Sequence, residues 1–372
     1  MGEEMRTTRT AAVVVGALVI GALAGCSNSG GTGASSAPET NGPLAMVGLY
    51  NLPYVNSVAE GARDAADAVG SQFTQYGPQG LDPNKAISDF QNAVAAGAEG
   101  VLAMAYPGDL WKAPIDRAVD QGVTVVTADN YSYGSKATAH VGAPKVAMGA
   151  GLADEFIKSL PADASGVIVP AICVAGLEVI MAPLEGFKAR IEEELPDVEV
   201  LDLEVTAGDP AGNFAAWQRI VAKYPDALGF VGACDVDLPN LVKIKETTDD
   251  PFLVGVTAGG DDPVAVQALE SGLIVGVVTQ RPWLQGYVGM TLIAGNAFEG
   301  KELPTGWINT GYDIVTADNV DEIVEILQDP DAAKAYYGAL GDEIVANADD
   351  LAHDPSTYQY DIASIDEPNP AP

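Results

Sequence analysis

Short apolar runs alternate with amphipathic stretches from Leu44 onward, and this alternation constrains the fold more than any other feature of the chain. Such a pattern predicts βαβ units, in which parallel strands form a sheet covered by helices on both faces. The first series has expected strands at 44–51, 73–76, 100–105, 123–129 and 138–141, and expected helices at 55–69, 83–96 and 110–121. The second has expected strands at 166–172, 199–205, 229–233, 253–256 and 274–279, and expected helices at 179–194, 211–224, 238–247 and 263–271.

Two such series in tandem predict an α/β protein with two doubly wound parallel-sheet domains joined by a hinge. We expect an N-terminal lobe from residues 44–142 and 281–308, and a C-terminal lobe from residues 143–280 and 309–330. Residues 331–372 are acidic and finish in a Pro-rich stretch, so we expect them to form a C-terminal extension on the surface, with its last residues disordered.

The first 43 residues predict export. Arg6 and Arg9 precede an apolar segment, 11–24, that is too short to span a bilayer as a stable helix. It ends in Leu23-Ala24-Gly25-Cys26, which resembles the bacterial lipobox, in which the Cys is acylated. We therefore expect a signal peptide at 1–25, a lipidated Cys26, and a flexible tether at 26–43, which is rich in Gly, Ser and Pro. The mature protein would then be lipid-anchored outside the cytoplasmic membrane; a plain transmembrane anchor is the alternative.

The charge balance argues against several partners. The chain has 18 basic and 52 acidic residues, a net charge of −34. Nucleic-acid binding depends on Lys and Arg neutralising phosphates, and an anionic membrane surface also attracts basic residues. We expect neither partner, and we interpret the acidic surface mainly as a source of solubility.

Enzyme signatures are also missing from the sequence. There is no Gly-x-Ser-x-Gly elbow, no phosphate-binding loop and no Cys/His spacing of a metal site, and the chain has only two histidines. The two neighbouring carboxylates Asp235 and Asp237 follow one strand, where they need not converge on one bond. We expect no enzymatic activity, no cofactor and no metal.

Polar and aromatic side chains follow the expected strands, where a doubly wound sheet binds its ligands. The candidates for ligand contact at these strand ends are Tyr54, Tyr106, Asp129, Asn130, Asp235 and Gln280, with Met181 from the helix at 179–194. Carboxylates and amides pair with vicinal hydroxyls, and flat aromatic rings cover the apolar faces of a sugar or polyol. These residues predict a cleft that binds a small polar solute.

At this point the chain resembles a family, the ribose-binding-protein-like substrate-binding lipoproteins of ABC transporters, which have the type I periplasmic binding fold. The resemblance covers about residues 44–318 and rests on the order of several weak motifs. These are Asn51-Leu52-Pro53-Tyr54, Glu60-Gly61-Ala62, Pro107 with Asp109, Asp129, Glu185-Gly186-Phe187, Asp235, and Gln280 with Pro282. It implies a monomer that closes on a solute and delivers it to an ABC permease.

The resemblance also implies individual roles. Tyr54 becomes a stacking aromatic, Asp129 a hydroxyl acceptor, Asp235 a residue near the ligand, and Gln280 a contact on the hinge side of the cleft. The duller alternatives are a turn-capping role for Asp129, a core position for Tyr54, and satisfaction of hinge backbone by Gln280.

Several positions depart from the family pattern. Asn130 stands where sugar-binding members carry Arg, residues 179–184 contain no Arg, and Cys234 replaces an Asn. An acidic position looks like Thr257 or is displaced to Asp261. These losses leave room for a polyol, a deoxy or substituted sugar, or a less polar small molecule.

Cys173 and Cys234 follow the first and third strands of the second series, which are neighbours in a doubly wound sheet. We therefore expect them to form a disulfide; two buried free thiols are the alternative.

The leading hypothesis for function is the solute-binding component of an ABC importer. A ligand-sensing receptor that signals to a membrane kinase is the alternative, and the sequence does not separate the two.

Overall fold

Two β-sheets and the helices around them make up the part of the chain that the computed structural model describes, namely residues 41–48, 53–176, 178–248, 250–260, 262–354, 365 and 369–370. The first sheet has the order β14 (Ala352–His353), β12 (Gly306–Asn309), β5 (Ala139–Gly142), β4 (Thr124–Ala128), β3 (Gly100–Ala103), β1 (Leu44–Val47) and β2 (Phe73–Tyr76). The second has the order β13 (Asp313–Val315), β11 (Gly276–Thr279), β10 (Leu253–Val256), β9 (Gly229–Gly232), β6 (Gly166–Ile172) and β7 (Val198–Val200), and β8 (Glu204–Val205) also pairs with β6. All pairs are parallel except β12–β14 and β11–β13. The expected fold class is confirmed.

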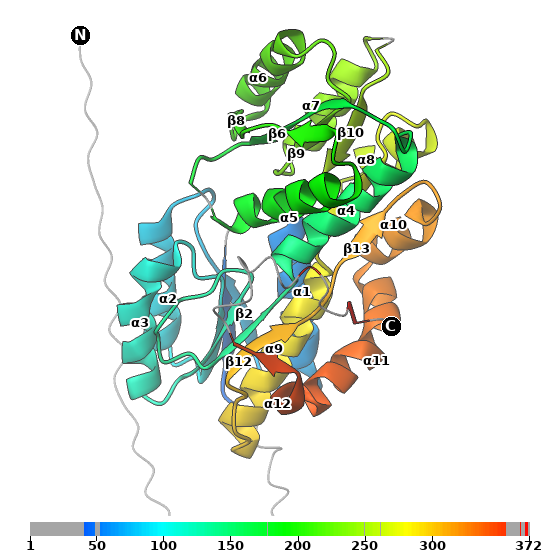
Figure 1. Cartoon of the computed structure of the whole chain (residues 1–372). Helices are drawn as coiled ribbons and strands as arrows, with labels where there is room; N and C mark the ends of the chain where they lie inside the picture. Colours follow the sequence, from blue (N-terminus) through cyan, green and yellow to red (C-terminus); the bar gives the residue numbers. More distant parts are fainter. Residues whose placement is uncertain are drawn as a thin grey trace, which may run out of the picture. The chain divides into compact units, whose positions relative to one another are not determined.

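Both faces of the first sheet are buried, because successive side chains of a strand point to opposite faces. Leu44 and Met46 of β1 join a core with the helices α1 (Pro53–Ala68) and α9 (Pro282–Glu299). Ala45 and Val47 join a separate core with α2 (Pro83–Ala95) and α3 (Gly108–Asp120). Figure 1 shows α2 and α3 on one side of this sheet and α1 and α9 on the other. Both faces of β1 therefore contact a hydrophobic core, which explains why each of its four residues is apolar.

The second sheet is also covered on both faces. The helices α4 (Lys145–Ser159) and α5 (Glu178–Glu194) pack against one face, where Phe156 and Phe187 meet edge to face. The helices α6 (Pro210–Lys223), α7 (Asp237–Lys245) and α8 (Val264–Glu270) cover the other face, where Trp217 packs against Phe230. The expected strand at 199–205 is divided into β7 and β8, which pair with different parts of β6.

Helices α4 and α5 approach each other unusually closely, and glycines permit this. A Cβ atom added to Gly149 would lie 1.6 Å from the carbonyl oxygen of Pro183, and one added to Gly186 would lie 1.9 Å from that of Val146. Only glycine fits such contacts between backbones. Gly149 lies inside α4, so it serves the packing of this helix against α5.

The chain passes between the two sheets four times. Three of the passages are short, at 143–144, 280–281 and 310–312, and we call these the crossover segments; the fourth lies between β13 and β14. Arg281 lies in the second one, in the left-handed backbone region with a φ of 50°. Its buried guanidinium donates to the carboxylate of Asp313 at 2.7 Å. Tyr337 donates its hydroxyl to the same carboxylate at 2.6 Å.

The C-terminal region differs from the expected surface appendage. Helix α11 (Pro330–Ala346) packs against α9 and buries Tyr337, Leu340 and Ile344, and β14 extends the first sheet by pairing with β12. Further along, Asn369 exchanges two hydrogen bonds with the backbone of Tyr312, and the Pro370 carbonyl accepts from Arg281. The helices α10 (Val320–Gln328) and α12 (Ala348–Leu351) complete this region. Helix α11 has few large apolar residues, so the sequence gives little sign that it packs against α9.

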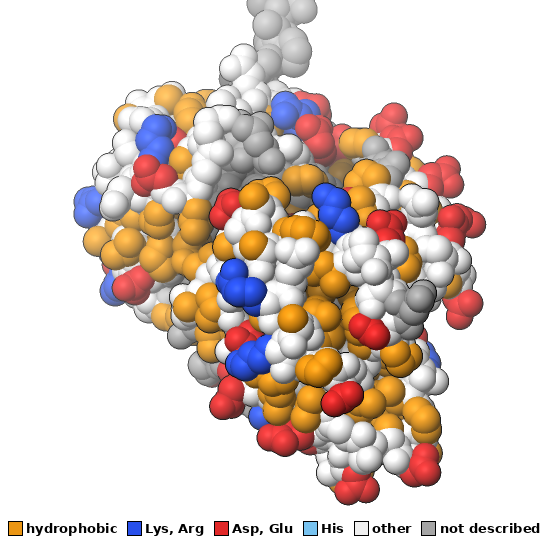
Figure 2. Space-filling model, turned by 90° about the horizontal axis from the view of Figure 1, so that it is seen from above, with side chains coloured by type: hydrophobic (Ala, Val, Ile, Leu, Met, Phe, Trp, Pro, Cys, Tyr) orange, Lys and Arg blue, Asp and Glu red, His pale blue; other side chains and the backbone are white. Residues whose placement is uncertain are grey.

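The surface is dominated by acidic groups, as the composition requires. Figure 2 shows acidic side chains around the edges of one face, with hydrophobic side chains between them. In the described part of the chain, none of the helices combines the length and the apolar character needed to span a membrane. The predicted signal peptide, Cys26 and residues 26–40 of the predicted tether lie outside the described residues.

Candidate functional site

A cavity of about 460 Å³ is lined by residues that follow strands of both sheets. The first sheet contributes Asp129 after β4, and Tyr54 comes from the start of α1. The second sheet contributes Asp235 after β9, Thr257 after β10 and Gln280 after β11. Parallel strands bring such residues to one edge of a sheet, where doubly wound folds bind ligands.

A smaller hollow of about 150 Å³ adjoins the cavity, since Tyr54 and Asp129 line both. It contains two further predicted residues, Tyr106 and Asn130. Six of the seven predicted ligand contacts therefore lie at one connected region: Tyr54, Tyr106, Asp129, Asn130, Asp235 and Gln280.

Met181 is the exception. It packs against the core between α4, α5 and the second sheet, and among the described lining residues its place is taken by its neighbours Val179 and Ile180. The sequence argument failed here because a helix turns by about 100° per residue, so adjacent side chains face different surroundings. The motif residues Asn51 and Leu52 and the displaced acidic candidate Asp261 lie outside the described residues.

Lys145 is the residue that the sequence analysis missed. It is the first residue of α4, its side chain is only 1% exposed, and it lines the cavity. Its ammonium donates to Asp129 Oδ1 and to Gln280 Oε1, so it joins two predicted ligand contacts from different sheets. A buried ammonium requires such partners. One signal was available in the sequence: a cation at a helix N-terminus opposes the helix dipole, so its presence there calls for a specific reason.

A hydrogen-bonded chain extends from Lys145 to Tyr54. The backbone carbonyl of Gln280 accepts from Gln285 Nε2 at 2.8 Å, and Gln285 Oε1 accepts from the Tyr54 hydroxyl at 2.9 Å. Gln285 is completely buried in α9 and was also missed by sequence reasoning. Tyr54 is therefore fixed at its hydroxyl, while the residue still lines the cavity.

Asp129 adopts the left-handed backbone region, with a φ of 58°. Asp and Asn enter this region more readily than other side chains that carry a Cβ atom. One carboxylate oxygen receives Lys145 and the other receives Asn130 Nδ2 at 2.9 Å. Asn130, which replaces an arginine of the family pattern, thus supports Asp129.

The two strand-end carboxylates Asp235 and Asp237 have different surroundings. Asp235 is exposed and lines the cavity. Asp237 is completely buried and accepts from Asn213 at 2.7 Å, from Trp217 at 2.8 Å and from the backbone N–H of Cys234 at 2.9 Å. Burial raises the pKa of Asp237, while these hydrogen bonds oppose the shift. Asp237 therefore organises the turn after β9 and does not form a catalytic pair with Asp235.

The cysteines of the second sheet form a disulfide between Cys173, after β6, and Cys234, after β9, with Cα atoms 6.2 Å apart. The two strands are neighbours, and both cysteines line the cavity. The disulfide therefore forms part of the cavity wall.

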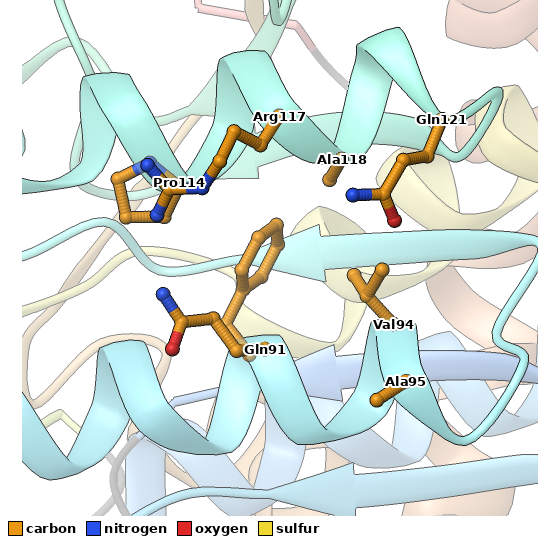
Figure 3. Close-up of a pocket in the computed structure, with 8 residues that line it drawn as sticks. Gln91, Val94, Ala95, Pro114, Arg117, Ala118 and Gln121 are labelled. Atoms are coloured by element: carbon orange, nitrogen blue, oxygen red, sulfur yellow. The ribbon is translucent and has the colours of Figure 1, made fainter.

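Two other features of the molecule do not line the cavity. His140 is completely buried in β5, and its Nδ1 shares a hydrogen bond with the Thr127 hydroxyl. Burial and the charge of Lys145 lower the pKa of His140 to about 3. A separate hollow of about 220 Å³ lies between α2 and α3, where Gln91 and Val94 face Arg117 and Gln121 (Figure 3). It shares no residue with the cavity. Among the described residues, no cluster of His, Cys, Asp or Glu could hold a metal ion.

Comparison with known proteins agrees with this geometry. A family model described as "Periplasmic binding protein domain" matches residues 45–302. Among curated protein sequences, none matches this chain.

Similar solved structures include a sugar-binding protein of a sugar ABC transporter from Bacillus halodurans, with 22% identity and a TM-score of 0.68, covering 75% of this chain and 99% of that one. A carbohydrate transporter solute-binding protein from Agrobacterium radiobacter in complex with D-arabinose has 21% identity and a TM-score of 0.69, covering 79% of this chain and 100% of that one. A periplasmic ribose ABC transporter protein from Conexibacter woesei has 22% identity and a TM-score of 0.67, covering 79% and 97%. At these identities the likeness shows the fold.

Proposed function

The chain belongs to the family of periplasmic binding protein domains, and on that premise we propose that it is the extracytoplasmic solute-binding component of an ABC importer. The proposed solute is a sugar or a sugar-like molecule, bound without chemistry. The observation that carries this proposal is the cavity of about 460 Å³, whose buried polar groups come from the strand ends of both sheets. Similar structures from sugar transporters support the class of solute.

The mechanism requires a solute that contacts both lobes. A ligand shifts a protein toward a closed form only by its additional contacts with that form. Lys145 already connects Asp129 with Gln280, so a solute seated there adds hydrogen bonds to groups that belong to different sheets. Tyr54 has its hydroxyl fixed by Gln285, which leaves its ring available to cover an apolar sugar face.

The remaining assignments follow from the position of each residue. We propose that Asp129 accepts hydrogen bonds from solute hydroxyls and that Gln280 accepts and donates them. Asp235 would accept a further hydrogen bond at the exposed edge of the cavity. Tyr106 and Asn130 line the adjoining hollow, where they would contact a solute that extends beyond the main cavity.

Membrane attachment through Cys26 belongs to the same proposal. A lipid anchor would keep the binding domain near an ABC permease, and the Gly/Ser-rich residues 27–36 would act as a flexible spacer. In cells, Cys26→Ser is expected to abolish incorporation of a labelled fatty acid and to release the protein from the membrane fraction. Continued fatty-acid incorporation in this variant would contradict the assignment.

Thermal-shift screening of the purified domain against pentoses, hexoses, deoxy sugars and polyols tests the function. A ligand that binds only the folded state raises the melting temperature with concentration. Gln280→Ala should lose this shift, whereas Gln218→Ala, an exposed glutamine on α6, should keep it. No shift with any of these compounds would contradict a sugar receptor.

A further inference from the structure

Two buried polar groups in the cavity retain unused hydrogen-bonding capacity. Lys145 has three N–H donors, and two of them serve Asp129 and Gln280. Within the described part of the chain its third donor has no protein partner. The Thr257 hydroxyl, in a residue only 2% exposed, also lacks a partner among the described residues. Buried polar groups are normally satisfied, so both groups are candidates for hydrogen bonds with a ligand.

Both groups can be placed relative to Gln280, to which Lys145 donates a hydrogen bond. Thr257 follows β10, and Gln280 follows the adjacent parallel strand β11. Helix α4, which begins with Lys145, packs against both strands. A single ligand can therefore present neighbouring oxygens to Lys145 and Thr257.

The wall contributed by α5 has the opposite character. Val179, Ile180 and Pro183 line the cavity there, in the segment for which the family resemblance predicts an arginine. The disulfide adds further apolar surface. A ligand hydroxyl directed at these three side chains would lose its hydrogen bonds with water and gain none from them, which disfavours binding.

The lining charges favour an uncharged ligand. Among the described residues that line the cavity, Lys145 is the only basic one, and it is paired with the buried Asp129. An anion would compete with Asp129 for the ammonium and would be repelled by Asp235 at the exposed edge of the cavity, and a cation would compete with the ammonium for Asp129. An uncharged ligand leaves the pair intact.

We propose that the cavity selects a deoxy sugar. Its vicinal oxygens bind Lys145 and Thr257, and its deoxy carbon packs against Val179, Ile180 and Pro183. This inference rests on the proposed sugar-receptor function and narrows it to one class of sugar. A fully hydroxylated sugar would direct one hydroxyl at these three apolar side chains, which offer it no hydrogen bond. Apolar pockets reject an added hydroxyl only moderately, so the expected preference is about 10- to 100-fold.

Calorimetric titration with matched sugar pairs tests the proposal. The pairs are L-rhamnose with L-mannose, L-fucose with L-galactose, and 2-deoxy-D-ribose with D-ribose, and each differs by one hydroxyl. The deoxy member of at least one pair should bind about 10-fold tighter or more than its partner. Equal or tighter binding of the hydroxylated member in every pair that binds overturns this inference and leaves the sugar receptor standing. Absence of binding by all six sugars also overturns this inference, and the sugar receptor is then decided by the wider thermal-shift screen.

Two variants identify the residues that select. Thr257→Val keeps the shape of the side chain and removes an unpartnered hydroxyl, so the melting temperature without ligand should not fall. Affinity for the preferred sugar should fall about 10-fold. Unchanged affinity would overturn the role of Thr257.

Ile180→Asn supplies a hydrogen-bonding partner on the apolar wall. It should reduce the preference for the deoxy sugar about 10-fold by improving the binding of the hydroxylated partner. The matched control is Ile87→Asn, a similarly half-buried position on α2 that does not line the cavity, and it should leave the preference unchanged. An unchanged preference in Ile180→Asn would overturn the role of the wall.

Discussion

Asp129 and Asp237 are two buried aspartates that follow parallel strands, yet they have different functions in the molecule. Asp129, after β4, pairs with the ammonium of Lys145 and lines the cavity. Asp237, after β9, is surrounded by neutral donors from Asn213, Trp217 and two backbone N–H groups. Both are buried, with exposures of 8% for Asp129 and 0% for Asp237, and both lie beyond the carboxyl end of a parallel strand. The comparison shows that the kind of partner, and whether a cavity lies beside the carboxylate, separate a candidate binding residue from a structural one.

The largest expected effect is an opposite response of the two regions to acid. Burial and the charge of Lys145 lower the pKa of His140 from 6.5 to about 3. In acid the unfolded chain therefore binds a proton that the folded chain excludes. The stability that His140 contributes above its ordinary pKa is lost as the pH falls toward about 3, by at most about 5 kcal/mol. The pKa of Asp237 is raised from 3.8, so its contribution to stability increases as the pH falls.

Urea unfolding of variants between neutral and acidic pH checks this difference. His140→Asn should weaken the loss of stability on acidification, and Asp237→Asn should strengthen it. Parallel pH profiles for the two variants would contradict the contrast.

The next largest effect is expected from removing the Asp237 carboxylate, which accepts hydrogen bonds from neutral donors. Asp237→Ala leaves the indole N–H of Trp217, the Asn213 amide and two backbone N–H groups without their acceptor. We expect the free energy of unfolding to fall by about 4 kcal/mol. Asp237→Asn keeps one acceptor oxygen and should cost about half as much. Calorimetric melting of both variants measures this, and a loss below about 1 kcal/mol in Asp237→Ala would exclude the structural role.

The charged pair should behave as a unit. Asp129→Asn or Lys145→Met alone leaves a buried charge without its partner and should cost about 3 kcal/mol of stability. The double variant should recover most of this loss, because no uncompensated charge remains. Solute binding should be lost in all three variants. Additive losses of stability in a double-mutant cycle would show that the two residues do not interact.

The smallest effect is expected at Asp313, which combines both kinds of partner, the cation Arg281 and the hydroxyl of Tyr337. Tyr337→Phe removes the neutral donor and keeps the ion pair. It should lower the free energy of unfolding by about 1 kcal/mol and leave solute affinity unchanged. A loss above about 3 kcal/mol in denaturant unfolding would show that the neutral donor dominates at this aspartate.

The sequence predicted the two sheets well because their strands are apolar at nearly every position. Leu44–Val47 and Gly229–Gly232 are buried on both faces, and such runs between turn signals are hard to place elsewhere. It failed at α11, where alanines and glycines give little apolar contrast and the partner surface on α9 is distant in the sequence.

At the site, the strand-end rule located Asp129, Asp235 and Gln280, because topology alone brings these ends together. It could not locate Lys145 or Gln285, whose roles depend on side chains that are far away along the chain. Lys145 reaches Gln280, 135 residues further on, and Gln285 is reached by Tyr54, which precedes it by 231 residues. Helical phase explains the error at Met181, one residue beyond Ile180.

The attachment of Asn369 and Pro370 to Tyr312 and Arg281 has a practical consequence for anyone who expresses this protein. An affinity tag fused after Pro372 follows Pro370 by only two residues, and Asn369 and Pro370 contact two of the crossover segments. Such a fusion competes for space with the contacts of the Arg281 guanidinium, and it can alter solute affinity without touching the pocket. A cleavable tag placed ahead of residue 41 keeps those contacts intact.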